Sequence, residues 1–152
     1  MALEFNTIGV KLKYKTESSA GTRPTSGYTE IPNIKSTPAI DINPSKIECT
    51  DLSDEYRRYI DGVKDVGDSF DFTANLTAAL KLAWGSCVSA ANTAWVSSKA
   101  TWFEISIPNF DSFYFAGIPS ELGVNEMGVD AVIESTLHVV PNQIHGWDSA
   151  ST

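Results

Sequence analysis

Residues 69–76 read Ser-Phe-Asp-Phe-Thr-Ala-Asn-Leu, in which polar and apolar side chains alternate strictly. Such alternation is typical of a β-strand with one buried and one wetted face, because successive side chains of a strand point to opposite sides. The apolar positions 70, 72, 74 and 76 are therefore predicted to face a core. Asp71, Thr73 and Asn75 are predicted to face outward. The segment indicates a fold built on β-sheet.

The same period of two recurs along the chain. Residues 10–15 place Val10, Leu12 and Tyr14 on one face and three lysines on the other. Two later strands are separated by the short Pro108–Asn109 connection, which predicts an antiparallel hairpin. The expected strands, besides 69–76, are residues 10–15, 46–50, 101–108, 113–117 and 131–140, with a short one near 39–42.

One stretch has a helical period instead. From Thr77 to Ala91, apolar side chains recur every three or four residues, which predicts an amphipathic helix. Gly85 costs such a helix about 1 kcal/mol relative to alanine, so a kink or an early end is expected there. The apolar stripe comprises Leu80, Ala83, Trp84, Cys87, Val88 and Ala91.

Residues 16–44 carry loop signals. Proline, glycine and serine recur too often for long regular elements. A loop of this length in a compact domain is usually functional or disordered. The segment 16–36 is therefore predicted to be a flexible arm, or a surface that becomes ordered against a partner.

Residues 50–68 mix acidic and basic side chains with tyrosines. Ser53 has the character of a helix N-cap and Gly62 that of a helix terminator, which predicts at most two helical turns between them. Tyrosine and arginine are enriched at protein interfaces. Two alternatives remain open from the residues alone, a solvated loop and a partner-binding loop.

These elements define the expected fold class. Six or seven strands, one moderate helix and no alternation of strands with helices predict a mainly β protein, an antiparallel β-sandwich or barrel with one flanking α-helix. A length of 152 residues favours a single domain, 1–152.

Charge and hydropathy exclude several classes of function. The chain carries 11 basic and 19 acidic residues, a net charge of −8. A net-acidic chain without a basic stripe is a poor tight binder of phosphate backbones. No apolar run approaches the roughly 20 residues of a membrane-spanning helix. The first residues lack a secretory signal, so synthesis in a cytoplasm is expected.

Motifs for catalysis are not found in the sequence. The glycine-rich loops of nucleotide sites, the GxSxG elbow and the HExxH helix do not occur. Asp51, Asp54 and Asp61 lack the ligand order of a calcium loop, and Cys49 and Cys87 have no metal-ligand spacing. We therefore expect no metal, no cofactor and no enzymatic activity. The alternative is a small β-barrel hydrolase or isomerase that uses Asp or Glu with His138.

The outward positions of the predicted strands form an unusual set. They are short, hydrogen-bonding or acidic, and none is lysine or arginine. Such a wall would let a polyanion pass without binding it, because like charges repel phosphates. An ordinary wetted surface is the alternative. The set comprises Asp71, Thr73, Asn75, Glu104, Ser106, Glu134 and Thr136.

In the order of these pieces, the sequence resembles the major tail tube protein of long-tailed bacteriophages. No single segment is a signature of that family, and the resemblance rests on the order and spacing of several. The segments that carry it are residues 9–14, 31–38, 47–54 running into 59–65, 70–75 and 113–117.

The resemblance implies a structural virion protein, made in the host cytoplasm and located in the phage tail. Its copies would form hexameric rings through open edge strands, and the rings would stack into a tube that meets tail-tip, tape-measure and terminator proteins. DNA would pass through the lumen without specific binding. A related bacterial secretion or injection apparatus is the alternative setting.

The resemblance also implies roles for two sets of residues. The outward set listed above would line the lumen. A long inter-subunit loop, residues 50–68, would reach the neighbouring ring, with candidate contacts at Thr50, Asp51, Asp54, Arg57, Arg58, Tyr59, Ile60, Asp61, Lys64 and Asp65.

Overall fold

The computed structural model describes residue 4 and residues 6–152. The chain divides into two compact units. The first contains the residues up to Pro38 together with Ser69–Thr152, and the second is Ala39–Asp68. Each unit has its own sheet. The residues predicted to line the lumen lie in the first unit, and the residues predicted to contact the next ring lie in the second.

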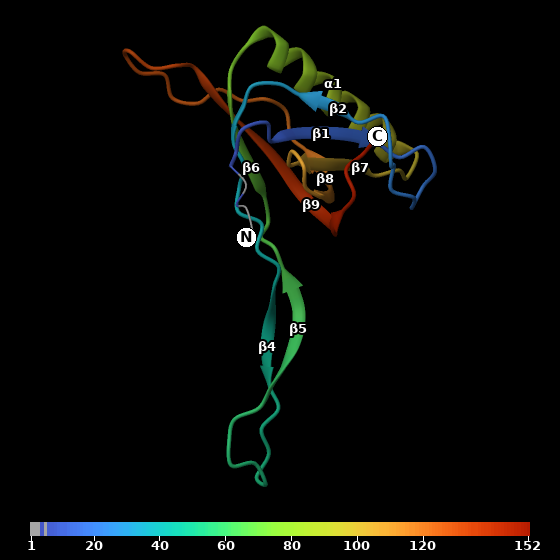
Figure 1. The fold of residues 1–152 in the computed structure, drawn as a ribbon, viewed down its shortest axis with the longest axis vertical. Coiled ribbons are helices and arrows are strands. Elements are labelled where there is room, and N and C mark those ends of the chain that lie inside the picture. The colour runs from blue at the N-terminus through green and yellow to red at the C-terminus, as the bar shows by residue number, and fades with distance from the viewer. Residues whose placement is uncertain (1–3, 5) are drawn as a thin grey trace. The chain divides into compact units, whose positions relative to one another are not determined.

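The first unit contains a seven-stranded antiparallel sheet in the order β2-β1-β7-β8-β9-β6-β3 (Figure 1). This confirms the expected mainly β fold, and the β7–β8 pairing confirms the predicted hairpin. The strands are β1 Lys11–Thr16, β2 Thr29–Ile31, β3 Ile34–Ser36, β6 Phe70–Asn75, β7 Thr101–Ser106, β8 Ser112–Pro119 and β9 Glu134–Asp148.

The two borders of this sheet are brought together by the chain itself. The border strands β2 and β3 are three residues each and are joined only by Pro32 and Asn33. Asn33 turns the chain with a positive φ of 62°, a conformation that asparagine tolerates better than most residues. The sheet therefore nearly closes into a barrel. The expected open edge strands are therefore β2 and β3, which are short and adjacent in sequence, and their pairing with neighbouring copies stays a prediction.

The helix α1, Ala78–Val96, packs on one face of this sheet (Figure 1). The side chain of Thr77 caps it by accepting a hydrogen bond from the Leu80 amide at 3.1 Å. The predicted stripe is buried except for half-buried Ala83, and Gly85 does not end the helix, which continues past Ala91. No described helix is long and apolar enough to span a membrane.

The core beneath α1 is aromatic. Phe115 has no exposed surface, and its ring centroid lies 5.0 Å from that of Phe70 and 5.4 Å from that of Phe103. Trp84 of α1 lies over Phe103 and donates a hydrogen bond from Nε1 to the Ser120 carbonyl at 2.8 Å. Paired rings stabilise beyond the area they bury, so this cluster joins the helix firmly to the sheet.

The last strand is longer than predicted. It begins at Glu134, near the expected position, and continues beyond Val140 to Asp148. The part beyond Val140 pairs with β8. Pro141 and Gly146 weaken the strand pattern in that part of the sequence. Two register shifts in β8, at 114/115 and 116/117, accommodate the irregularity.

The second unit is an antiparallel pair, β4 Asn43–Glu48 and β5 Tyr59–Asp65. The predicted strand at 39–42 is wrong, since the strand begins only at Asn43. The predicted helix between Ser53 and Gly62 is also wrong. Tyr59 pairs with Glu48, so the chain is extended where the helix was expected. Ser53 donates hydrogen bonds from its amide and hydroxyl to the Asp51 carboxylate, which caps a turn rather than a helix.

Candidate assembly surfaces

Five of the seven predicted wall residues form one patch on the face of the β6–β9 pair opposite to α1. The register places Asp71 opposite His138, Thr73 opposite Thr136 and Asn75 opposite Glu134. Residues directly opposite in an antiparallel pair project from the same face. We call Asp71, Thr73, Asn75, Glu134 and Thr136 the β6–β9 wall.

At one end of this wall, Asp71 accepts a hydrogen bond from His138. Its Oδ1 lies 2.6 Å from His138 Nδ1 and 2.8 Å from the Ser69 hydroxyl. The His138 contact, followed by that of Ser69, lowers the pKa of Asp71. A carboxylate with a lowered pKa in open solvent is a weak base, which does not favour the alternative of an enzyme built on His138.

At the other end, the wall contains a cation that the strand pattern did not reveal. Lys35 of β3 forms an ion pair with Glu134. Thr136 exchanges hydrogen bonds with the Asn125 side chain at 3.1 and 3.2 Å. The wall is therefore polar and only mildly acidic, because one of its two carboxylates has a lysine partner.

Glu104 does not belong to this wall. Its side chain is 0% exposed, and β7 lies two strands away from β9 in the sheet. The Tyr114 hydroxyl lies 2.7 Å from its Oε2, and Ser151 donates from its amide at 3.0 Å and from its hydroxyl at 2.8 Å. The expectation that Glu104 faces solvent is wrong, because residues 149–152 cover that part of β7. Ser106 of the same strand is half-buried and pairs with Lys11.

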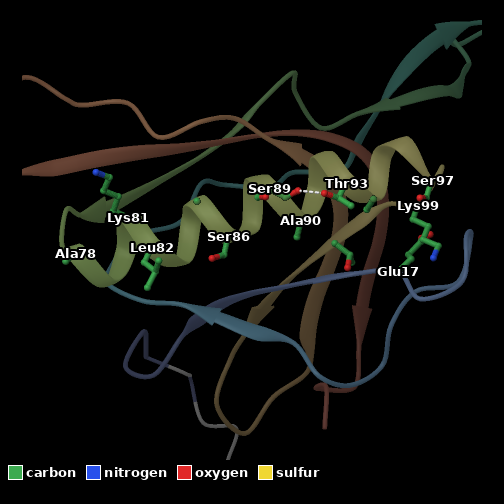
Figure 2. A pocket seen from close by; sticks show the side chains of 13 residues that line it. Glu17, Ala78, Lys81, Leu82, Ser86, Ser89, Ala90, Thr93, Ser97 and Lys99 are labelled. Atoms are coloured by element: carbon green, nitrogen blue, oxygen red, sulfur yellow. Dashed lines mark hydrogen bonds between the residues drawn. The ribbon is translucent and has the colours of Figure 1, made fainter.

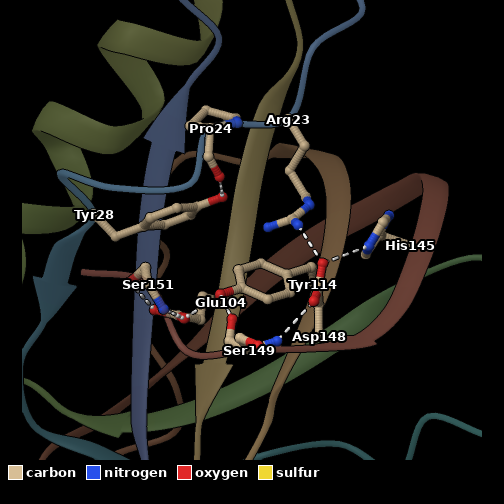
Figure 3. A network of polar contacts seen from close by, with 9 residues as sticks. All are labelled: Arg23, Pro24, Tyr28, Glu104, Tyr114, His145, Asp148, Ser149 and Ser151. Carbon is tan, nitrogen blue, oxygen red and sulfur yellow. Dashed lines mark hydrogen bonds and ion pairs between the residues drawn. The ribbon is translucent and has the colours of Figure 1, made fainter.

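A polar network surrounds Glu104 (Figure 3). The Arg23 guanidinium lies 4.2 Å from the centre of the Tyr114 ring and forms an ion pair with Asp148 at 2.5 Å. Asp148 also contacts His145 Nε2 at 3.2 Å. Tyr28 packs against the Tyr114 ring at 5.9 Å, and burial raises its pKa to about 12. The network joins the segment around Arg23 to the end of the chain.

The arm predicted at 16–36 has a second anchor at its start. Glu17 is buried, and it accepts hydrogen bonds from Trp102 Nε1 at 2.8 Å and from the Gly21 and Ala100 amides at 2.9 and 3.2 Å. Burial alone would raise the pKa of Glu17, but these hydrogen bonds lower it. The last part of the arm forms the sheet strands β2 and β3, and the mobility of the arm in the free chain stays a prediction.

We expect Glu104 to make the stability of the first unit dependent on pH. Burial opposes its ionisation, but hydrogen bonds from Ser151 and Tyr114 lower its pKa below the ordinary 4.5. A carboxyl group whose pKa is lower in the folded state stabilises the fold at pH values above its unfolded-state pKa. This contribution disappears as the pH falls through the folded-state pKa. Glu104→Gln should cost about 1–3 kcal/mol near neutrality, since it weakens hydrogen bonds to a charged group.

Urea unfolding of wild type and Glu104→Gln at about pH 6 and about pH 3 measures this effect, and the difference should shrink at the lower pH. Asp41→Asn is the matched control, because Asp41 is exposed. A difference that is independent of pH would contradict the role of the Glu104 charge.

The second unit contains all ten predicted inter-ring residues. None of residues 39–68 is buried. Cross-strand ion pairs hold the hairpin together on one face, with Lys46 contacting Asp61, while Ile47 and Ile60 pair on the other face. At the tip of the hairpin, Arg58 Nε forms an ion pair with Asp54 Oδ2 at 2.8 Å. Two-stranded hairpins are marginally stable alone, so an exposed apolar pair of this kind favours a covering partner.

The described residues do not bring together a candidate metal centre. Among residues 4 and 6–152, no three His, Cys, Asp or Glu side chains lie close enough together to hold a metal ion. Cys87 is buried in the core, and burial raises its pKa to about 12, so its thiol is unreactive.

The architecture places the chain in a class of fold found in phage-type tail particles. No protein-family model matches the sequence, and no curated protein matches it. Several solved structures share this fold, and each match covers nearly the whole chain. One is a subunit in the tail of an empty gene transfer agent particle, refined with C6 symmetry, with a TM-score of 0.59, 12% identity and coverage of 97% of this chain and 100% of that one.

Two further structures agree. A subunit of the six-fold symmetrised anti-feeding prophage baseplate matches with a TM-score of 0.63 and 6% identity over 96% of this chain and 97% of that one. A chain in the virion of a native gene transfer agent particle matches with a TM-score of 0.60 and 12% identity, over 96% and 100%. The resemblance to tail tube proteins is thus confirmed at the level of the fold.

Proposed function

We propose that this chain is a structural subunit of a phage-type tail tube, whose copies form hexameric rings that stack around a central lumen. The observation that carries the proposal is the fold shared over nearly whole chains with subunits of a C6-symmetric tail and a six-fold baseplate. Because the identities are low, the match supports the architecture, and the surfaces of this chain supply the rest of the argument.

The β6–β9 wall is our candidate for the lumen lining. Its side chains are short and polar, and the Asp71 charge is balanced only when His138 is protonated. Such a surface stays hydrated and gives phosphate groups little cationic charge to bind. DNA would then pass through the lumen without specific binding. Glu104 is excluded from this lining because its side chain is buried. Ser106, half-buried on β7, would line the lumen apart from the wall.

The β4–β5 hairpin is our candidate for the contact between stacked rings. It forms a compact unit of its own, and it exposes the Ile47–Ile60 pair. An interface that covers this pair would supply the apolar burial that the hairpin lacks. The charged residues around its tip would then set the register between rings.

The location and partners follow from the same proposal. The chain would reside in the tail of the virion after synthesis in the host cytoplasm, with tail-tip, tape-measure and terminator proteins at the ends of the tube. We propose no catalytic activity and no cofactor. Residues 1–152 would act as one tail-tube domain, with the arm at 16–36 and the interface loop at 50–68.

A tube in a bacterial injection apparatus is the second candidate. The baseplate chain and the gene transfer agent chains match with similar TM-scores, 0.63 against 0.59 and 0.60, so the shared fold supports both candidates. The two candidates share the assembly and differ in the cargo that passes through the lumen.

Electron microscopy and light scattering of the purified protein at rising concentration test the proposal. We expect rings and then tubes. A chain that remains monomeric at every concentration would contradict both candidates.

Charge reversal in the β6–β9 wall should affect passage rather than assembly. We expect Asp71→Lys with Glu134→Lys to leave tubes intact and to slow DNA release, because lysines in the lumen would bind phosphates. The rate of DNA ejection from particles carrying both substitutions measures this. Glu30→Lys with Asp111→Lys is a control of equal charge at exposed positions outside the wall. An unchanged ejection rate would remove the lumen assignment.

A further inference from the structure

The outer surface of α1 is unusual for an exposed helix. Lys81 is the only charged residue among its nineteen residues. Leu82, Trp95 and Val96 are largely exposed, Leu82 at 74%. A helix that faces solvent normally carries charged side chains on that face, and charged residues are depleted at the cores of protein interfaces. The free face of α1 therefore has the composition of an interface.

A groove runs along this face (Figure 2). Its volume is about 1000 Å³. Leu82, Ser86, Ser89 and Thr93 line one side of it, and Lys81 and Lys99 stand near its two ends. Glu17 also lines it, but that carboxylate is occupied by Trp102 and two amides. The groove therefore presents a net positive charge to an incoming segment.

The same unit contains a segment of complementary character. Residues 126–132 lie in the connection between β8 and β9 and contain Glu126 and Asp130 but no basic residue. Met127, Val129 and Val132 are exposed, Val129 at 93%. Long connections without secondary structure are usually functional. An acidic segment with exposed apolar side chains is suited to a neutral groove with lysines at its ends.

The dimensions of the two parts agree. The helix from Leu82 to Ser97 is about 22 Å long at 1.5 Å per residue. Seven residues span at most about 25 Å when extended. A segment of the length of 126–132 can therefore follow the groove from one end to the other.

The occupant must come from another copy. In its own chain the segment follows Glu121 and Leu122, which line the flank of α1 beside Trp84 and Val88. It is held at its start by the Ser135 hydroxyl, which donates to the Gly123 carbonyl, and by the Asn125–Thr136 hydrogen bonds. These contacts tie the start of the segment to β9 rather than to the groove.

We propose that the groove along α1 binds residues 126–132 of a neighbouring copy of this chain. The contact joins two different surfaces, so it is head-to-tail, and repetition around an axis closes a ring. It rests on the proposed function and names the surface through which neighbours in one ring meet.

A charge-swap series tests this interface. Lys81→Glu with Lys99→Glu, and separately Glu126→Lys with Asp130→Lys, should each lower the association constant at least about tenfold, because like charges then meet across the contact. All four substitutions together should restore association to within about threefold of wild type. Sedimentation velocity measures the association constant, and unchanged thermal unfolding shows that each variant is folded.

Lys11→Glu with Lys15→Glu is the matched control, with the same change in charge at exposed or half-buried positions outside the groove. A second measurement does not depend on charge. In a Cys49→Ser background, oxidation of Ser89→Cys with Val129→Cys should yield a covalent ladder of multimers, and Ser26→Cys with Val129→Cys should not.

The outcomes separate this interface from the proposed function. If wild type forms rings but the four-fold swap fails to restore association or the cysteine ladder does not form, the groove contact is wrong and ring assembly stands. If wild type never associates, both are wrong.

Discussion

Phe115→Ala should lower the free energy of unfolding of the first unit by about 3–5 kcal/mol. Phe115 is fully buried, with Phe70 and Phe103 at ring distances of 5.0 and 5.4 Å and a stacked contact to Phe72 at 6.2 Å. Removing its ring leaves a cavity between rigid neighbours on two strands, β6 and β7. The lost burial and the unfilled space both destabilise the fold.

Equilibrium urea unfolding followed by tryptophan fluorescence measures this loss, with Phe115→Leu as the control. Leucine restores much of the volume, so its cost should be about 1–1.5 kcal/mol. A loss below about 1 kcal/mol for Phe115→Ala would contradict a core centred on this ring cluster.

Ile60→Asp should abolish the stacking of rings while leaving the subunit folded. Ile60 is 54% exposed and pairs across the hairpin with Ile47, which is 50% exposed. A carboxylate at this position costs the free hairpin little, because water still reaches it. In an interface that covers the pair, the same charge would be buried without a partner, which costs several kcal/mol.

Tube length in electron micrographs measures the effect, with Ile60→Val as the conservative control. We expect isolated rings for Ile60→Asp and normal tubes for Ile60→Val. Tyr59→Asp, on the other face of the hairpin, should also shorten tubes if the interface encloses both faces. Normal tube lengths for Ile60→Asp would exclude the hairpin as the contact between rings.

The strands and the helix that could be predicted are those whose sequence pattern matches the burial of their side chains in the structure. The alternation in 70–75 and the stripe from Leu80 to Ala91 match the burial that the structure shows, since one face of each meets the same core. The β7–β8 hairpin followed from its short connection. These features are fixed by neighbours in sequence.

The features that were predicted wrongly depend instead on contacts between residues that are far apart in the sequence. Glu104 alternates like an exposed residue, but Ser151, 47 positions later, returns to cover it. Asp71 and His138 are 67 positions apart, so no spacing within either segment indicates their contact. The signals at Ser53 and Gly62 were read as helix ends because strand pairing with Ile47 and Glu48 cannot be read locally.

The wall was only partly predictable for the same reason. Alternation identified the residues of β6 and β9 that share a face, and the register of the two strands brought them together. Lys35 entered the wall from β3, a three-residue strand that loop signals conceal. The charge predicted from β6 and β9 alone was therefore more negative than the charge of the β6–β9 wall.

Cryo-electron microscopy of the assembled protein is the most direct test of the central claim, that copies of this chain surround a lumen. We predict rings with six copies, with Asp71 and Thr73 facing the bore and α1 away from it. Assemblies without a central channel, or rings in which α1 lines the bore, would contradict the account.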